Sequence, residues 1–288
     1  IFPASIAKIF FSDNGSTSVD LAIKMALQYY FNKGEKRNKV IALQNAFHGD
    51  TFGAMSVSGL SVYNGPFEDF LLSIERIDVP DNQNWESVEK KFQKLLDTGE
   101  IAAFIYEPLV QGAASMHMFA PEHLDQLINM AHKAQVLTIA DEVMTGFGKT
   151  GKNFASEYME AKPDLICLSK SLTAGVAPMA LTCCSQKVYD AFYDEEISKG
   201  FFHGHTYSAN PLACTAAIAG IELLCSAQIQ HSIQRINKRH LEFENYIKDN
   251  PKVKSTRVKG VIFAMDLNVQ MDRYGKLRDQ LFAFFMKQ

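Results

Sequence analysis

Short apolar segments alternate with amphipathic ones over most of the chain. Apolar runs of four to six residues are typical of strands covered on both faces, and helices between such strands are typical of a parallel sheet. The segments predict an α/β fold in three layers (α/β/α), with a mostly parallel sheet between helices. The predicted strands are 39–43, 101–106, 136–140, 165–168 and 180–184, and the predicted helices are 17–30, 121–134 and 209–225.

The first of these helices has start and stop signals in the sequence. Thr17 and Asp20 have the spacing of a capping box, and Gly34 follows the predicted helix as its stop. We therefore expect this helix to begin at Thr17.

The pattern changes after about residue 227. A polar amphipathic helix at 229–248 precedes a strand at 260–267 and a final helix that reaches Gln288. We predict a large domain at 1–227 and, at 228–288, the incomplete start of a smaller α+β C-terminal domain.

Composition excludes several classes of protein. Hydrophobic residues make up 47% of the chain and charged residues 21%, which excludes disorder as the main state. The net charge is −3 and no basic stripe is present, which argues against a nucleic-acid partner. The five cysteines form no C-x-x-C pair, no apolar run reaches membrane-span length, and residues 1–4 do not resemble a signal peptide. We expect a cytoplasmic protein with reduced thiols and no membrane partner.

Two familiar patterns lack their structural context. Residues 146–151 match G-x-G-x-x-G, but they neither follow a strand directly nor open a helix, as dinucleotide binding requires. His203 and His205 have no third ligand nearby. We therefore expect no dinucleotide and no metal.

Reactive side chains follow three of the predicted strands: Glu107, Asp141 and Lys170. In such folds ligands bind beyond the carboxyl ends of the strands. Taken alone, a buried acid at this position is more typical of a structural ion pair or of bonds to backbone amides, and a lysine after a strand is typical of a solvated strand end. Their combination fits pyridoxal 5′-phosphate, which needs a lysine amine in an apolar pocket and a carboxylate facing its ring nitrogen. Its phosphate needs a helix N-terminus with small residues, which 14–17 provide, and Phe47 could stack on its ring.

Seven short motifs occur in one order along the whole chain. They are 12–16 (SDNGS), 47–51 (FHGDT), 140–143 (ADEV), 145–148 (TGFG), 168–172 (LSKSL), 203–206 (HGHT) and 209–213 (ANPLA). Together they resemble the class III pyridoxal-phosphate-dependent aminotransferases, which have the type I fold of these enzymes.

The resemblance implies roles for residues of one chain. Lys170 would be the Schiff-base lysine and proton shuttle, and Asp141 would pair with the pyridine nitrogen. Gly15 and Ser16 would bind the phosphate, while Phe47 and Val143 would pack on the two faces of the ring. Substrate would lie beside Lys170, Phe47 and Gly204.

The resemblance also implies a homodimer with shared active sites. Thr206, with His205, would reach the phosphate in the neighbouring subunit. A small-molecule amino donor and an oxo-acid acceptor would be the remaining partners.

Within the family, 48–57 and 202–206 are most similar to members that transfer an amino group from S-adenosylmethionine to 8-amino-7-oxononanoate in biotin biosynthesis. Those members usually have Tyr where this chain has Phe47, so the ring is kept and its hydroxyl is lost. Two alternatives stay open at this point. One is another ω-aminotransferase, acting on ornithine, 4-aminobutyrate or a diamine, and the other is a non-catalytic dimeric scaffold of the same fold.

Overall fold

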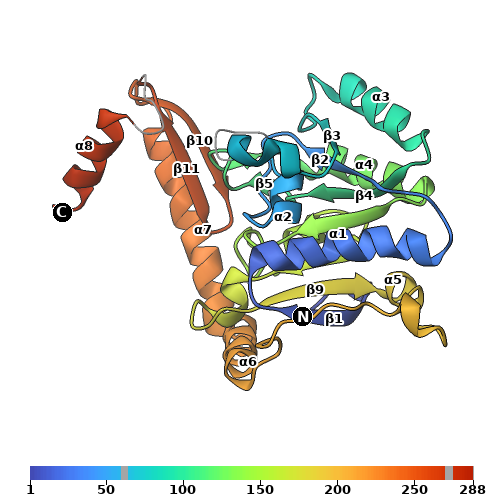
Figure 1. The fold of residues 1–288 in the computed structure, drawn as a ribbon. Coiled ribbons are helices and arrows are strands. Elements are labelled where there is room, and N and C mark those ends of the chain that lie inside the picture. The colour runs from blue at the N-terminus through green and yellow to red at the C-terminus, as the bar shows by residue number, and fades with distance from the viewer. Residues whose placement is uncertain (60–63, 270–274, 288) are drawn as a thin grey trace.

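A central sheet organises the structure, a computed structural model that describes residues 1–59, 64–269 and 275–287. Within these ranges seven strands follow the order β1-β9-β8-β7-β4-β2-β3 (Figure 1). Among the described strands of this sheet, β9 pairs antiparallel with β1 and with β8, and the other pairs are parallel, so the predicted mostly parallel sheet is confirmed. The strands are β1 (Ile6–Ser12), β2 (Lys39–Leu43), β3 (Ile74–Ile77), β4 (Ile101–Tyr106), β7 (Leu137–Asp141), β8 (Leu165–Leu168) and β9 (Ala180–Ser185).

Helices cover both faces of this sheet, because its strands alternate apolar side chains between two buried layers. In β4, Ala103 and Ile105 face one layer, while Phe104 and Tyr106 face the other. The first layer contains α1 (Gly15–Asn32), α2 (Phe52–Val57) and α5 (Gln186–Asp190). The second contains α3 (Trp85–Leu96), α4 (Pro121–Lys133) and α6 (Pro211–Cys225). The three predicted layers are therefore present.

Helix α1 begins two residues before the predicted start. Asn14 is its N-cap, and its Oδ1 accepts a hydrogen bond from Thr17 N (3.0 Å). Asn is among the strongest N-cap residues, and Thr17 returns the bond by accepting from Asn14 N (3.3 Å). The expected Thr17–Asp20 capping box is wrong, because Asp20 instead accepts from Ala54 N of α2 (2.6 Å).

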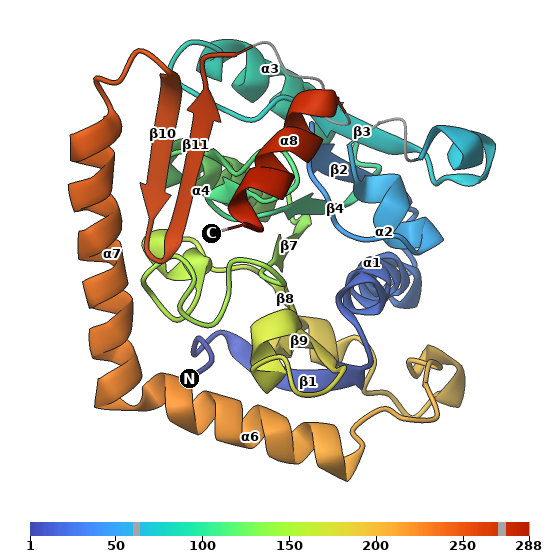
Figure 2. The same cartoon turned by 90° about the vertical axis from the view of Figure 1, so that its left-hand side faces the viewer.

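The C-terminal part forms a separate two-stranded sheet beside a long helix. Helix α7 (Ala227–Ile247) follows α6 at an angle of 66°, and Figure 2 shows the two running along adjacent sides of the molecule. The antiparallel hairpin of β10 (Val253–Lys259) and β11 (Ile262–Leu267) lies beside α7, and α8 (Lys276–Phe285) comes last. The predicted strand at 260–267 corresponds to β11, whereas β10 was not predicted. Gln288 lies outside the described residues, and the two-domain division stays a prediction.

The described helices include none that is by itself long and apolar enough to cross a membrane. One bent pair, α6 with α7, meets the length and composition requirements only jointly.

Candidate active site

A cavity of about 410 Å³ lies where the carboxyl ends of β2, β4, β7 and β8 meet. The parallel arrangement brings these ends to one edge of the sheet, as expected for a ligand site of this architecture. Six of the predicted site residues line it: Gly15, Ser16, Phe47, Asp141, Val143 and Lys170. Residues without a predicted role also line it, among them His48, Gly49, Gly112, Met116, Met144 and Ser169.

Asp141, the last residue of β7, is held by two hydrogen bonds. Its Oδ2 lies 2.7 Å from His48 Nδ1, and its Oδ1 accepts from Val143 N (3.0 Å). Asp141 and His48 are 4% and 3% exposed, so the pair is screened from water. Because a carboxylate only accepts hydrogen bonds, His48 donates its Nδ1–H, which fixes the tautomer and orients the acid.

His48 is the functional residue that sequence reasoning missed. It stands directly after Phe47 in one of the quoted motifs, but the motif alone does not show that its ring turns toward Asp141. Its Nε2 is buried and has no hydrogen-bond partner among the described residues.

Glu107 connects two loops at the rim of the cavity. Its Oε2 accepts from Phe47 N (3.0 Å), and its Oε1 accepts from Gly112 N (3.1 Å). Burial raises the pKa of this carboxyl from 4.5 to about 7, and the nearby charge of Asp141 acts in the same direction. Glu107 therefore positions the ring-bearing loop at 44–51 as well as the loop after β5 (Val110–Gln111).

Lys170 enters the cavity from a strained backbone position. It opens the 3-10 helix η3 (Lys170–Thr173) directly after β8 and has a φ of 44°, in the left-handed region that non-glycine residues seldom adopt. Such strain is common at functional sites. The side chain is exposed in the single chain, so the expected apolar enclosure of the lysine is not provided by this chain alone.

The N-terminus of α1 forms one end of the cavity. Asn14 satisfies the amides of Thr17 and Ser18, which leaves those of Gly15 and Ser16 as first-turn donors without an intrahelical acceptor. A Cβ on Gly15 would lie 2.8 Å from Val143 Cγ1, so only glycine allows the helix end and this side chain to approach. The geometry suits an anion at the helix end and a flat ring against Val143.

Glu142 has a structural task on the other side of the strand. It is fully buried and accepts from Thr145 Oγ1 (2.9 Å), Ala155 N (2.8 Å) and Ser156 N (2.7 Å). Burial raises its pKa. Glu142 thereby fixes the glycine-rich loop at 146–151, which leads into a short 3-10 helix, Ala155–Tyr158, rather than a nucleotide-binding helix.

The predicted residues Gly204, His205 and Thr206 do not line the cavity of their own chain. Thr206 is exposed, and His205 Nδ1 lies 3.3 Å from Asp13 Oδ1, next to the N-cap of α1. His203 Nδ1 contacts Lys24 Nζ (3.1 Å) instead of a metal-binding group, and the described residues contain no metal-ligand cluster. The five cysteines form no disulfide in the structure.

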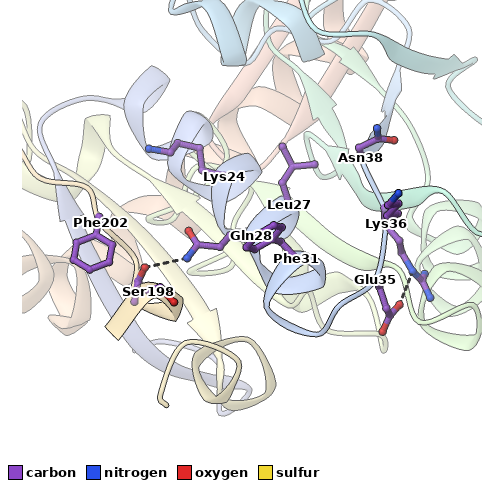
Figure 3. Close-up of a pocket in the computed structure, with 11 residues that line it drawn as sticks. Lys24, Leu27, Gln28, Phe31, Glu35, Lys36, Asn38, Ser198 and Phe202 are labelled. Carbon is purple, nitrogen blue, oxygen red and sulfur yellow. Dashed lines mark hydrogen bonds and ion pairs between the residues drawn. The ribbon is translucent and has the colours of Figure 1, made fainter. Parts of the chain in front are cut away.

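A second cavity, of about 710 Å³, lies along the C-terminal half of α1 (Figure 3). Lys24, Gln28 and Phe31 of α1 lie around it with Phe202. None of the predicted site residues lines this cavity. Its carboxylate and lysines do not lie beside the N-terminus of a helix. The cavity at the strand ends is therefore the candidate active site.

Comparison with known proteins decides the family. The model of the family described as aminotransferase class-III matches residues 1–283. The chain belongs to the class-III aminotransferase family. The predicted type I fold is confirmed with it, because the similar solved structures are transaminases with the same architecture.

Individual relatives give a finer likeness. The chain is 45% identical over 277 residues to adenosylmethionine-8-amino-7-oxononanoate aminotransferase of Synechococcus elongatus, covering 93% of this chain and 64% of the relative. The crystal structure of the Methanocaldococcus jannaschii protein of that name is 33% identical, with a TM-score of 0.86 over 92% of this chain and 62% of the other. An ω-transaminase of Pseudomonas jessenii in complex with PMP is 26% identical, with a TM-score of 0.86 over 93% of this chain and 62% of the other. The chain thus spans less than two thirds of the length of each relative.

The residues present fit pyridoxal 5′-phosphate, a cofactor of this family. Two first-turn amides at Gly15 and Ser16 suit its phosphate, and the absent Cβ of Gly15 makes room beside Val143. Asp141 presents a buried, oriented carboxylate to the same cavity, and Lys170 an amine.

Proposed function

We propose that the protein is a pyridoxal-phosphate-dependent aminotransferase that uses S-adenosylmethionine as donor and 8-amino-7-oxononanoate as acceptor, a step in biotin biosynthesis. The observation that carries the aminotransferase activity is the meeting of Asp141, Lys170 and the N-terminus of α1 in one cavity. The names of the relatives support the choice of substrates.

The first task of the chain is to hold the cofactor. The amides of Gly15 and Ser16 would bind the phosphate at the positive end of α1. Phe47 would cover one face of the ring and Val143 the other. Asp141, oriented by His48, would hold a proton on the ring nitrogen, because a carboxylate stabilises the charged pyridinium in a site screened from water.

The second task is proton transfer at the substrate. Bound pyridoxal phosphate supplies the electron sink that makes the α-carbon of an amine acidic. Lys170 would hold the cofactor covalently between turnovers and, once displaced by the donor's amine, would move the α-proton. The same residue would return a proton to the acceptor in the second half of the cycle, which gives ping-pong kinetics.

We also propose a homodimer in which His205 and Thr206 complete the neighbouring site. This proposal is supported by the exposure of Thr206 and by the absence of both residues from the cavity of their own chain. Substrate would lie near Gly204 for the same reason.

A half-reaction experiment tests the substrates. The purified holoenzyme is mixed separately with S-adenosylmethionine, ornithine and 4-aminobutyrate, and conversion of the cofactor to its amine form is followed by visible absorbance. We expect S-adenosylmethionine to convert it fastest. Conversion by ornithine or 4-aminobutyrate alone would favour the second candidate, another ω-aminotransferase, which the likeness to the Pseudomonas jessenii enzyme supports.

A Lys170→Ala variant tests the activity itself. We expect a folded protein without turnover, because the role of the lysine is covalent and its removal leaves no buried charge unpaired. Turnover within tenfold of the wild type would refute the assignment of Lys170. A wild type that binds pyridoxal phosphate without forming the lysine-bound absorbance would instead point to the non-catalytic scaffold.

A further inference from the structure

One wall of the cavity is a strained five-residue loop. Residues 112–116 connect β5 to β6 (His117–Met118), and Met116 lines the cavity together with Gly112. Ser115 and Met116 have φ values of 58° and 55°, two consecutive left-handed residues that are not glycine. Such a turn persists only when its surroundings hold it in place.

A residue distant in sequence provides that support. Arg257 of β10 donates from Nη2 to Ser115 O (2.9 Å) and from Nε to Met116 O (3.1 Å). The guanidinium thus holds the carbonyls of both strained residues with its rigid fork. Arg257 does not itself line the cavity.

Neighbouring side chains in the hairpin orient the guanidinium of Arg257. Asp266 of β11 accepts from Arg257 Nη1 (2.6 Å) and Nη2 (3.1 Å), a two-point pairing. Ser255 Oγ also accepts from Nη1 (3.1 Å). A bidentate pair fixes the direction of the remaining donors, which point at the loop.

The hairpin is itself fixed to the glycine-rich loop after β7. Val261 N donates to Lys149 O (3.0 Å), and a Cβ on Gly260 would lie 2.3 Å from Gly151 N. Ile262 packs in the same apolar cluster as Met116 and Met144. Arg257 is therefore anchored on a docked element rather than a free one.

We propose that Arg257 is a positioning residue that sets the Met116 wall of the cavity and thereby selects substrates by size. The inference rests on the proposed function and adds to it the residue that adjusts the substrate side. The other end of the loop is held separately, because Gly112 N donates to Glu107. Loss of Arg257 therefore frees the Met116 end and leaves Asp141 and Phe47 in place.

Hydrogen exchange measures the first consequence without any turnover. Met116 N donates to Gly112 O and His117 N to Ala114 O, so both amides report on the loop. In the cofactor-free protein, Arg257→Ala should raise their exchange rates at least tenfold, and Arg257→Lys should raise them less. Arg239→Ala removes an arginine from an exposed ion pair with Glu242 and should leave them unchanged. Unchanged exchange in Arg257→Ala overturns the proposal.

Half-reaction kinetics measure the second consequence. For the larger of two donors that the wild-type holoenzyme accepts, Arg257→Ala should change KM about tenfold. For alanine or another small donor KM should change less than twofold, and kcat should be kept for both. An equal change in KM for both donors would show a merely structural role and overturn the proposal.

Two controls keep the outcomes separate. Should Arg257→Ala fail to fold, Asp266→Asn keeps the arginine and weakens only the pairing that orients its guanidinium. We expect a threefold change in the amide exchange rates and in KM for the larger donor. If the wild type does not react with S-adenosylmethionine, the proposed substrate fails, whereas the exchange of Met116 and His117 still tests Arg257.

Discussion

Adjacent acidic residues at the end of β7 have opposite environments. Successive side chains of a strand point to opposite sides, so Asp141 faces the cavity and Glu142 the glycine-rich loop. Glu142 is saturated by backbone and hydroxyl donors, whereas Asp141 has one histidine and one amide. The partners of each carboxylate therefore distinguish the residue available for chemistry from the one that fixes a loop.

Replacement of Asp141 tests this distinction. Asp141→Asn should lower kcat roughly a thousandfold, a loss of about 4 kcal/mol at the transition state, because a neutral amide cannot keep the ring nitrogen protonated. Asp164→Asn is the matched control, a buried aspartate that accepts from Thr138 N (3.0 Å) away from the cavity. It should lower the free energy of unfolding and leave kcat within a few-fold. Similar kcat values for the two variants would make Asp141 merely structural.

Glu107 makes stability depend on pH. Its pKa of about 7 in the folded state exceeds the ordinary 4.5, so the folded state holds this proton more tightly. Below about pH 4.5 the carboxyl is protonated in both states. As pH rises from there through 7, the unfolded state loses its proton first, and the free energy of unfolding falls. Glu107→Gln should remove this fall, because an amide does not titrate.

Urea unfolding at several pH values between 5 and 8 measures the effect. Besides the flatter profile, Glu107→Gln should stay within about 1 kcal/mol of the wild type at pH 5, because the carboxyl is protonated there and, like the amide, offers one carbonyl acceptor. Glu86→Gln, at an exposed position of α3, should keep the wild-type profile. Parallel profiles for Glu107→Gln and the wild type would show that another group is responsible.

At the scale of elements, the site depends on how closely the loop after β2 approaches α1. Ser16 Oγ accepts from Asp50 N (3.1 Å), and Gly49 lies against the first turn of the helix with a φ of 135°. A Cβ on Gly49 would lie 2.2 Å from Ser16 Oγ and 2.8 Å from Ser16 Cα. The phosphate-binding end of α1 and the loop that carries Phe47 therefore form one unit.

Two alanine variants separate this contact from backbone strain. Gly34, with a φ of 75°, has nothing within 4 Å of its Cβ position, so Gly34→Ala should cost only the left-handed penalty of about 1 kcal/mol. Gly49→Ala should cost about 1–3 kcal/mol more, since Ser16 must move. It should also weaken pyridoxal phosphate binding at least tenfold, while Gly34→Ala leaves binding unchanged. Equal dissociation constants for the two variants, measured by fluorescence titration, would contradict the model of a shared unit.

The buried strands could be predicted from the sequence because each one contains its own apolar run, which is visible without knowledge of the neighbouring strands. Strands β2, β4 and β8 lie at the expected residues, since an unbroken apolar run indicates burial on both faces. The polar strand β10 was missed, because a half-buried strand paired only with β11 has no such run. The start of α1 was misplaced because Asn14 and Thr17 both suit a cap, and only the fold decides between them.

The candidate site divides in the same way. Asp141 and Lys170 follow buried strands directly, so topology alone brings them to one edge of the sheet. The loop of His48 is held by Glu107 and the turn at Met116 by Arg257, in each case a residue far away in sequence. Pairwise contacts of that kind leave no local pattern in the chain.

At the scale of the whole molecule, the loop at 203–206 is the part of the predicted site that its own cavity does not contain. His205 contacts Asp13, beside the cap of α1, while Thr206 is exposed. A threonine hydroxyl that bonds to a phosphate contributes about 1–2 kcal/mol, the scale of a hydrogen bond to a charged group. Thr206→Ala should therefore weaken cofactor binding about five- to thirtyfold, and removal of the cofactor should shift the equilibrium from dimer towards monomer.

Mixed dimers decide which chain Thr206 serves. A Lys170→Ala chain is combined with a Thr206→Ala chain, and the heterodimer is isolated by two different affinity tags. Only one site then retains Lys170, and in a shared arrangement it receives the intact Thr206 of its partner. That site should bind pyridoxal phosphate as tightly as the wild type, measured by the absorbance of the lysine-bound cofactor, because both groups it needs are present. Binding as weak as in the Thr206→Ala homodimer would mean that Thr206 acts within its own chain, and the shared-site model would then be wrong.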